Sequence, residues 1–244
     1  MLEFTVGNFL SFKEKKTLSL EATNIKELPE NIIERDGYKV LNSAVIYGAN
    51  SSGKSNLLKA FAFMRTTILN SSKLNSVDEL GVTPFLLNTE TEKKPSFFEL
   101  LILIEGKRLR YGFEIDNVSI HTEWLFILSK DSKKEQLLFV RDKNGIAVDG
   151  FFSKAEELIE KTRDNALFLS VCDTWGIGLA QSIVKYFDYT SVLSGIKHER
   201  EYTMTLMMLR KETLGKKIKE FLVKFKLGFN DICNYDDDKK LDPM

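Results

Sequence analysis

One eight-residue stretch decides how this chain is interpreted: Gly48-Ala49-Asn50-Ser51-Ser52-Gly53-Lys54-Ser55. Its pattern, G-x-x-x-x-G-K-S, is typical of loops that bind the phosphates of a nucleoside triphosphate. Glycines at both ends let the backbone curl so that successive N–H groups point inward at an anion. A helix that starts near Gly53 would present free N–H groups and the positive end of its dipole to the phosphates.

The flanks of this loop have the order that such a site requires. Residues 44–47 (Ala-Val-Ile-Tyr) are apolar and partly β-branched, which predicts a buried strand. Apolar residues after the loop recur at spacings of three or four, the stripe of an amphipathic helix: Leu57, Leu58, Phe61, Met64 and Ile68. Eight matching positions with these flanks argue against a chance glycine- and serine-rich loop.

The residue types also predict individual roles. Lys54 would bridge the β- and γ-phosphates as a point charge, so it is the predicted catalytic residue. The Ser55 hydroxyl would ligate Mg²⁺. We therefore expect ATP and Mg²⁺ as cofactors, held by nine consecutive residues: Gly48, Ala49, Asn50, Ser51, Ser52, Gly53, Lys54, Ser55 and Asn56. No motif that would read the base of the nucleotide is visible.

Composition places the chain among ordinary globular proteins. It has 244 residues, 43% hydrophobic and 29% charged, and a formal net charge of zero, which gives no overall attraction to nucleic acid or membrane. Cys172 and Cys233 show no metal-ligand or disulfide pattern, and we expect them to be thiols in a reducing cytosol. His121 and His198 stand alone, which favours structural roles. We see no signal peptide and no membrane-length apolar run, and expect a cytoplasmic protein.

The first part of the chain predicts a hairpin and a loop. Leu2, Phe4 and Val6 alternate with polar residues, and residues 17–21 alternate again, so we expect two antiparallel strands. Residues 24–37 are polar and contain Pro29 and Gly37, so we expect a loop there.

Residues 97–148 predict a β-meander. The expected strands are 98–104, 109–115, 120–128 and 136–141, with turns at 105–107, 116–117 and 143–145. The aromatic residues of this segment have two interpretations, a platform on which bases stack or the packed face of an antiparallel sheet, and we favour packing.

The last part of the chain predicts helices. Residues 153–165 form the first, with Ser153 and Glu156 as a capping box; an apolar run over 166–171 and a helix over 179–187 follow. Residues 211–227 predict a lysine-rich amphipathic helix. It either contacts an anionic partner or, as we favour, packs one apolar stripe on the core, composed of Leu214, Ile218, Phe221, Leu222 and Phe225. An acidic tail at 236–240 should be mobile.

Two groups of residues carry a resemblance to a known family: Phe4, Asn8, Phe9, Ser11 and Phe12, then residues 45–58. With them the chain resembles the heads of ABC-type ATPases, and more narrowly the RecF-like and OLD-like group and the AAA-labelled ATPases of phage-defence and abortive-infection loci. Residues 83–85, 95–97, 111–113 and 123–125 also resemble the stretch that follows the phosphate loop in these proteins. The resemblance extends to about Phe168 and is most specific in the first sixty residues.

The chain also departs from the family. Leu10 stands where many of these heads have an arginine that reaches toward the nucleotide, and Ser51 stands where glycine is common. Neither Gln136 nor Gln181 can be assigned as the glutamine of the Q-loop. The family needs a serine-glycine signature and an apolar strand ending in Asp-Glu. Residues 193–195 (Leu-Ser-Gly) and the aspartates at 236–238 resemble these motifs but lack the required context, so we expect the chain to be the N-terminal part of a head.

From these observations we expect an α/β fold: a P-loop NTPase of the ABC-head type, with a mixed sheet around the phosphate loop and an added antiparallel β-meander, incomplete at its C-terminus. The expected regions are a P-loop core over 1–95, the meander over 96–150 and a helical region over 151–244.

The resemblance implies that ATP binding drives dimerisation of heads in a bacterial defence or DNA-maintenance ATPase, with hydrolysis once the missing motifs are supplied. The expected partner is a second copy, a partner ATPase or an effector such as a nuclease or toxin; nucleic-acid binding stays open, and no membrane is expected. The alternative is a non-catalytic module that binds nucleotide as a switch and docks a partner protein. A small-molecule kinase is disfavoured, because kinases usually place helical lids after the loop.

Overall fold

The computed structural model describes residues 1–23, 27–128, 134–195, 199–226, 228 and 231–232. The chain divides into two compact units, Met1–Ser191 and Val192–Met244. His198, Cys233 and the acidic stretch at 236–240, for which the sequence made predictions, lie outside the described residues.

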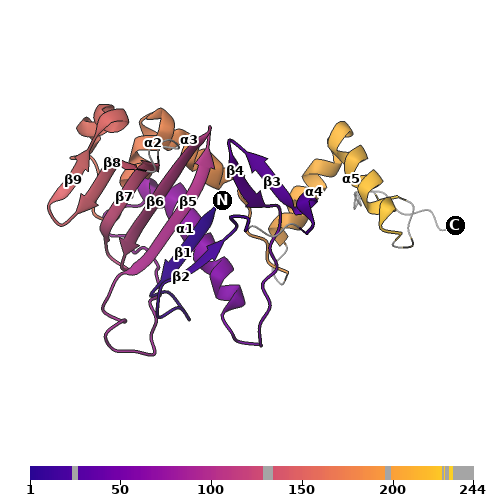
Figure 1. Ribbon diagram of the computed structural model, residues 1–244, viewed down its shortest axis with the longest axis horizontal. Helices are drawn as coiled ribbons and strands as arrows, with labels where there is room; N and C mark the ends of the chain where they lie inside the picture. Colours follow the sequence, from indigo (N-terminus) through magenta and orange to yellow (C-terminus); the bar gives the residue numbers. More distant parts are fainter. Residues whose placement is uncertain (24–26, 129–133, 196–198, 227, 229–230, 233–244) are drawn as a thin grey trace, which may run out of the picture. The chain divides into compact units, whose positions relative to one another are not determined.

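A seven-stranded antiparallel sheet forms the base of the first unit (Figure 1), in the order β2-β1-β5-β6-β7-β8-β9. Its strands in chain order are β1 Glu3–Gly7, β2 Lys16–Ser19, β5 Ser96–Ile104, β6 Lys107–Ile115, β7 Ile120–Leu128, β8 Glu135–Asp142 and β9 Gly145–Val148. The predicted hairpin is confirmed, with Phe4 opposite Leu18. The predicted meander is confirmed as β5 to β8, and β9 extends it.

The expected mixed sheet is not found, because every strand pair among the described residues is antiparallel. Residues 44–47, predicted as a buried strand before the loop, have no strand structure; Val45 is 71% exposed and Tyr47 87%. The reason is physical: β-branched residues favour a strand only when a neighbouring strand pairs with them, and no described strand pairs with this run.

The predicted loop at 24–37 instead contains the first strand and the turn of a second, two-stranded sheet. A short 3₁₀ helix, η1 (Pro29–Asn31), precedes β3 (Ile32–Arg35) and β4 (Tyr38–Leu41), which pair as a hairpin. Asp36 and Gly37 turn between them with φ of 52° and 77°. This is the backbone that an Asp-Gly pair adopts most readily in a two-residue hairpin turn, so the dipeptide was the overlooked signal.

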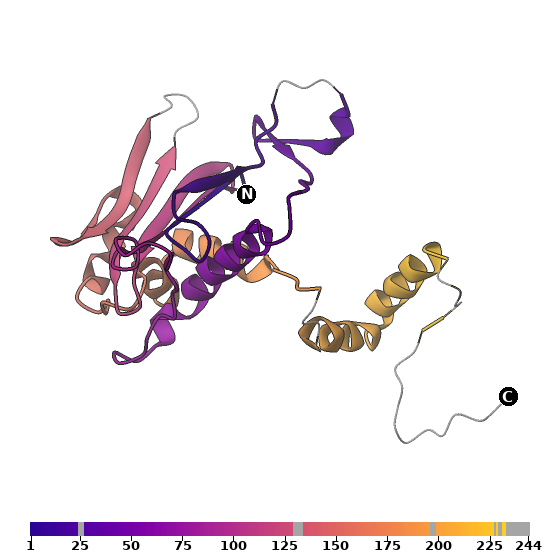
Figure 2. The ribbon, with the colours of Figure 1, turned by 90° about the horizontal axis from the view of Figure 1, so that it is seen from below.

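Three helices lie on one side of the large sheet: α1 Lys54–Asn70, α2 Phe168–Thr174 and α3 Gly178–Tyr189 (Figures 1 and 2). Helix α3 confirms the prediction at 179–187, and the apolar run at 166–171 is buried where α2 begins. The core lies between sheet and helices. Its aromatic residues include Phe98, Tyr111, Phe113 and Phe139, all fully buried, so these rings pack in the core rather than forming an open stacking platform.

Helix α1 is fixed on this core by one face. Met64 and Ile68 are buried as predicted, and Phe61 packs edge-on against Phe4 of β1 with ring centroids 5.3 Å apart. Leu58, predicted to belong to the stripe, is 52% exposed, because the buried face runs through Ala60 and Met64 and Leu58 lies beside it. The 3₁₀ turn η2 (Ser71–Lys73) ends this segment.

The helix α1 is also tied to α3 by a charged side chain. The Arg65 guanidinium donates to the Phe187 and Thr190 carbonyls at 2.8 and 2.7 Å, at the end of α3. A cation at a helix C-terminus satisfies carbonyls that have no partner within the helix. The helix that carries the loop residues is thus held on two sides.

The predicted helix at 153–165, with its capping box, is wrong. The chain forms a 3₁₀ helix, η3 (Gly150–Leu158), that starts after Asp149 without a side-chain cap, and residues 159–165 follow as turns and irregular chain. Buried Arg141 donates to the Ala166 carbonyl at 2.8 Å and to those of Arg163 and Asp164, and the Ile120 N–H donates to the Asp164 carbonyl. These hydrogen bonds hold residues 163–166 in a non-helical conformation, so the predicted α-helix cannot continue to residue 165.

The second unit contains α4 (Glu199–Leu209) and α5 (Glu212–Lys224). The predicted helix at 211–227 is confirmed as α5, and within the second unit three residues of its predicted apolar stripe are exposed: Leu214, Phe221 (60%) and Phe225. The two helices meet instead at Gly215, which is buried and where a Cβ would lie 2.5 Å from the Leu209 carbonyl oxygen. Among the described residues, no helix combines the length and apolarity needed to cross a membrane.

Candidate functional site

The predicted phosphate loop is an exposed curl that leads into α1. Ser51 and Gly53 have φ of 63° and 92°, in the left-handed region, and Gly53 is the residue at which α1 starts. A Cβ on Gly48 would lie 2.7 Å from the Ser52 hydroxyl oxygen. Glycine suits Gly53 because of its left-handed backbone, and a side chain at Gly48 would force the Ser52 hydroxyl to move.

The Lys54 side chain closes this curl. Its ammonium donates to the Gly48 and Ala49 carbonyl oxygens at 2.8 and 2.6 Å, and the Ser52 hydroxyl lies 3.4 Å away. The charge is therefore held at the mouth of the loop by atoms of the loop itself. A phosphate that enters the curl would compete with these two carbonyls for the ammonium protons.

The start of α1 has the electrostatic character of an anion site. Its first turn contains no acidic residue, and no side chain caps its N–H groups. Those N–H groups carry the positive end of the helix dipole, and Lys54 adds a full charge in the same turn. Ser55 is exposed beside them. The geometry thus suits the phosphate chain of a nucleotide, with Ser55 available to a cation.

The structure brings the nine predicted residues together in one continuous segment and adds a neighbour that the prediction omitted. The Asn56 amide nitrogen donates to the Ser11 hydroxyl oxygen at 2.9 Å. Ser11 belongs to the turn between β1 and β2, far away in the sequence. The signal available in the sequence was the Asn-Phe-x-Ser-Phe motif at 8–12, which carried the family resemblance without a role for its serine.

The departures from the family pattern have simple structural descriptions. Leu10 has φ of 48°, packs against the core, and donates its N–H to the Thr83 carbonyl at 3.0 Å. Gln136 is exposed on β8 and Gln181 is exposed on α3. Residues 193–195 have no helix or strand structure. No group of three or more His, Cys, Asp or Glu among the described residues has the arrangement of a metal site.

Two titratable groups with shifted pKa values lie in the core. Burial raises the pKa of Glu123 and of Tyr111. Glu123 accepts hydrogen bonds from the Tyr111 hydroxyl at 2.9 Å and from the Phe168 and Leu169 N–H groups at 2.7 and 3.0 Å. Glu123 is fully buried, two of these bonds join β7 to α2, and the third joins β7 to β6, so we assign it a structural role.

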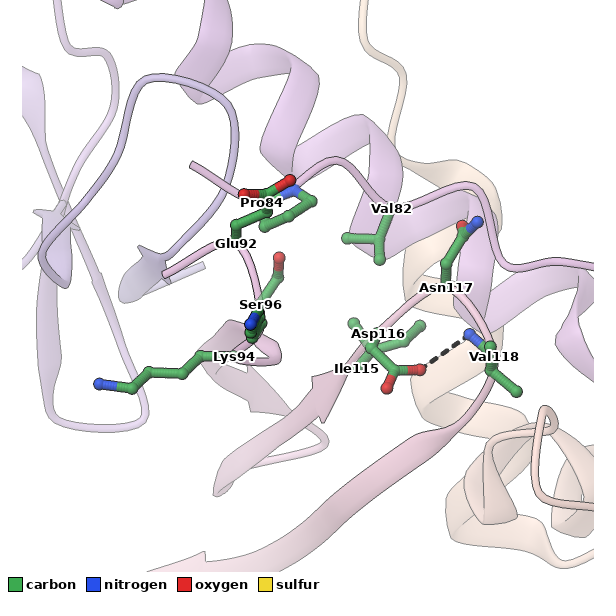
Figure 3. A pocket seen from close by; sticks show the side chains of 10 residues that line it. Val82, Pro84, Glu92, Lys94, Ser96, Ile115, Asp116, Asn117 and Val118 are labelled. Carbon is green, nitrogen blue, oxygen red and sulfur yellow. Dashed lines mark hydrogen bonds between the residues drawn. The ribbon is translucent and has the colours of Figure 1, made fainter. Parts of the chain in front are cut away.

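Two pockets are separate from the loop. One, about 260 Å³ in volume, is lined by Val82, Pro84 and the turn after β6 (Figure 3), where Asp116 accepts a hydrogen bond from the Val118 N–H. Burial opposes ionisation of Asp116, yet bonds from His121, Ser119 and Val118 outweigh it and lower its pKa. The other pocket, about 450 Å³, includes His121, Arg141 and Thr162. Neither contains a residue of the predicted site.

Comparison with known proteins adds one match. Residues 43–174, more than half of the chain, match a family described as "AAA domain, putative AbiEii toxin, Type IV TA system". A search of curated proteins gave no match. The matched range includes the loop, α1 and the sheet from β5 to β9, together with α2.

Proposed function

Because the chain belongs to the AAA-domain family described as putative AbiEii toxins of type IV toxin–antitoxin systems, we propose that residues 48–56 bind ATP and Mg²⁺. The backbone N–H groups of the loop and of the first turn of α1 bind phosphate oxygens. Lys54 neutralises charge on the β- and γ-phosphates, and Ser55 holds the Mg²⁺ ion.

One observation carries this proposal: the loop combines left-handed Gly53, the uncapped and acid-free start of α1, and the Lys54 ammonium at one point. Each of these alone is common, but their coincidence inside the matched range is what a phosphate site requires. ATP supplies the phosphoryl chemistry, and the residues of this chain bind and orient it.

We further propose that bound ATP closes two heads of the ABC type against each other and that hydrolysis reopens them. The water-activating carboxylate would come from a partner, either a second copy or another chain. This proposal is supported by the resemblance of the first sixty residues and by the toxin–antitoxin description of the family, and the setting that we propose is bacterial defence.

The binding step is tested by the affinity for Mg-ATP, measured by calorimetry on the full chain and on Lys54→Ala. We expect the variant to lose at least about tenfold in affinity, because a charge-assisted contact to phosphate is removed. Lys59→Ala is the matched control, since Lys59 is an exposed lysine on the same helix. Equal binding by Lys54→Ala and the full chain would contradict the proposal.

Hydrolysis is tested by turnover at increasing protein concentration. If two copies build the working site, the rate rises faster than linearly with concentration and disappears in Lys54→Ala. Binding without turnover at any concentration would mean that the carboxylate belongs to a different partner.

A second function is favoured by the apolar side chains that the described structure leaves exposed, among them Val45 and Tyr47 before the loop and Met207 and Phe221 in the second unit. Such side chains mark surfaces that contact other proteins. In this alternative the chain binds nucleotide only as a switch and docks a partner protein. Turnover by the isolated chain that Lys54→Ala abolishes would rule it out.

A further inference from the structure

The turn between β1 and β2 lies against the end of the phosphate loop, next to Gly53 and Asn56. Ser11 accepts a hydrogen bond from the Asn56 amide at 2.9 Å. A Cβ placed on Gly53 would lie 2.9 Å from the same Ser11 oxygen, which shows how closely the hydroxyl lies against the backbone of Gly53. The same oxygen atom therefore accepts a bond from the first turn of α1 and occupies the space that a side chain at the last glycine of the loop would need.

This turn is itself held in place from its other side. The Asn8 amide donates to the Thr91, Lys94 and Pro95 carbonyls at 2.8, 2.7 and 3.2 Å, and its oxygen accepts the Phe85 N–H at 3.1 Å. Asn8 is buried. Four bonds from a buried side chain fix the start of the turn firmly.

The remaining residues of the turn are also bonded. Phe9 and Phe12 exchange backbone hydrogen bonds of 3.0 and 2.8 Å, and the Leu10 N–H donates to the Thr83 carbonyl. Ser11 is thus presented by an anchored turn, although the residue itself is exposed. A hydroxyl on an anchored turn can restrict the motion of Gly53, whereas a hydroxyl on a mobile loop would move together with Gly53.

We infer that Ser11 is a positioning residue of the phosphate loop, acting through Asn56 and Gly53. It keeps the start of α1 and the left-handed turn at Gly53 in register with the sheet. In this role the Asn56 amide binds Ser11, and Asn56 affects a bound ligand indirectly, by fixing the conformation of the loop. The role of this contact in ligand binding rests on the proposed function, whereas the contact itself is a feature of the fold.

The first test needs no nucleotide. Amide hydrogen exchange at residues 51–56 is compared in the full chain, Ser11→Ala, Asn56→Ala and the double variant. Because each single change removes the same hydrogen bond, we expect each to speed exchange by about tenfold and the double variant to add nothing further. Ser11→Thr, which keeps the hydroxyl, should restore slow exchange. Ser19→Ala is the control, since Ser19 lies in the same hairpin and bonds Glu3 instead.

The second test is the Mg-ATP affinity of the same variants, with their melting temperatures measured alongside. We expect weaker binding in Ser11→Ala and Asn56→Ala, no further loss in the double variant, and melting temperatures close to that of the full chain. A positioning role requires this pattern, whereas a merely structural role would lower the melting temperature and leave affinity unchanged.

The two tests separate two failures. If the full chain binds no Mg-ATP but the exchange pattern holds, the proposed function fails and the positioning role stands. If the full chain binds Mg-ATP but Ser11→Ala exchanges at the normal rate, or if the two single effects simply add, the positioning role is overturned and the proposed function stands.

Discussion

Gly53 shows at the level of one residue why the loop has its pattern. Its φ of 92° is unfavourable for any residue with a Cβ, and a Cβ there would also press on Ser11. We expect Gly53→Ala to cost about 1–2 kcal/mol in stability and to weaken Mg-ATP binding. Urea unfolding and calorimetry measure the two effects. Gly178→Ala is the control, because Gly178 has open space around it; equal effects of the two changes would refute the assignment.

Glu123 predicts a contrast between two substitutions. In Glu123→Ala the Phe168 and Leu169 N–H groups and the Tyr111 hydroxyl lose their acceptor inside the core. We expect a loss of about 3 kcal/mol in unfolding free energy. Glu123→Gln keeps one acceptor oxygen and should cost less than half as much. Similar losses for both, measured by urea unfolding at neutral pH, would contradict this role.

The same residue predicts a pH dependence. Burial raises the pKa of Glu123 above its value in the unfolded chain, so the folded protein retains this proton more strongly. The stabilisation from the protonated form is complete below the unfolded pKa and is lost as the pH rises through the folded pKa. Since Gln cannot ionise, the advantage of the natural residue over Glu123→Gln should shrink as the pH rises across that interval. Unfolding free energies at several pH values test it, and a growing advantage would contradict it.

Residues whose roles depend on near neighbours in the sequence could be proposed from it, whereas residues whose roles depend on distant contacts could not. The loop residues could be proposed as a phosphate site from the sequence, because glycine spacing and lysine position are local features. Ser11 was not assigned a role, because its contact with Asn56 depends on how β1 and α1 pack together. Glu123 was likewise invisible as a structural carboxylate, since only the fold shows which N–H groups surround it.

At the level of elements, Asn8 links the first turn to the segment at 83–96. Its φ of 47° suits asparagine, and its side chain makes four hydrogen bonds. We expect Asn8→Ala to cost about 3 kcal/mol and to speed hydrogen exchange at residues 85–95. Asn8→Asp keeps the acceptor for Phe85 but places a buried carboxylate against three carbonyl oxygens, so it should cost at least as much as Asn8→Ala. Unchanged exchange in this segment would show that other contacts hold it.

Helices and strands whose formation depends on nearby residues were predicted correctly. Segments whose conformation depends on contacts with residues far away in the sequence were not. Alternation within β5 to β8 and the short turns between them were enough to predict the meander, because each strand pairs with the next. Residues 44–47 have the composition of a strand but lack a pairing neighbour among the described strands. The end of the helix predicted at 153–165 failed because Arg141, on β8, binds the carbonyls of Arg163, Asp164 and Ala166.

For the whole molecule, the division into two units predicts that the first is independently stable. All residues of the buried apolar cluster lie between Phe4 and Phe187, within Met1–Ser191. We expect a chain of residues 1–191 to unfold cooperatively with a melting temperature within a few degrees of the full chain, as followed by circular dichroism. A large decrease, or loss of the cooperative transition, would mean that the second unit contributes to the core.

The sheet order has a consequence for how the molecule folds. From β5 to β9 each strand neighbours its successor, so these hairpins close over short chain distances and should form early. By contrast, Glu3 of β1 pairs with Leu101 of β5, and the whole segment between them must be enclosed before that pairing is complete. The enclosed segment contains the phosphate loop and α1. The proposed nucleotide site therefore lies inside the longest of these loop closures, and we expect a newly made chain to bind nucleotide only once β1 has paired with the finished meander.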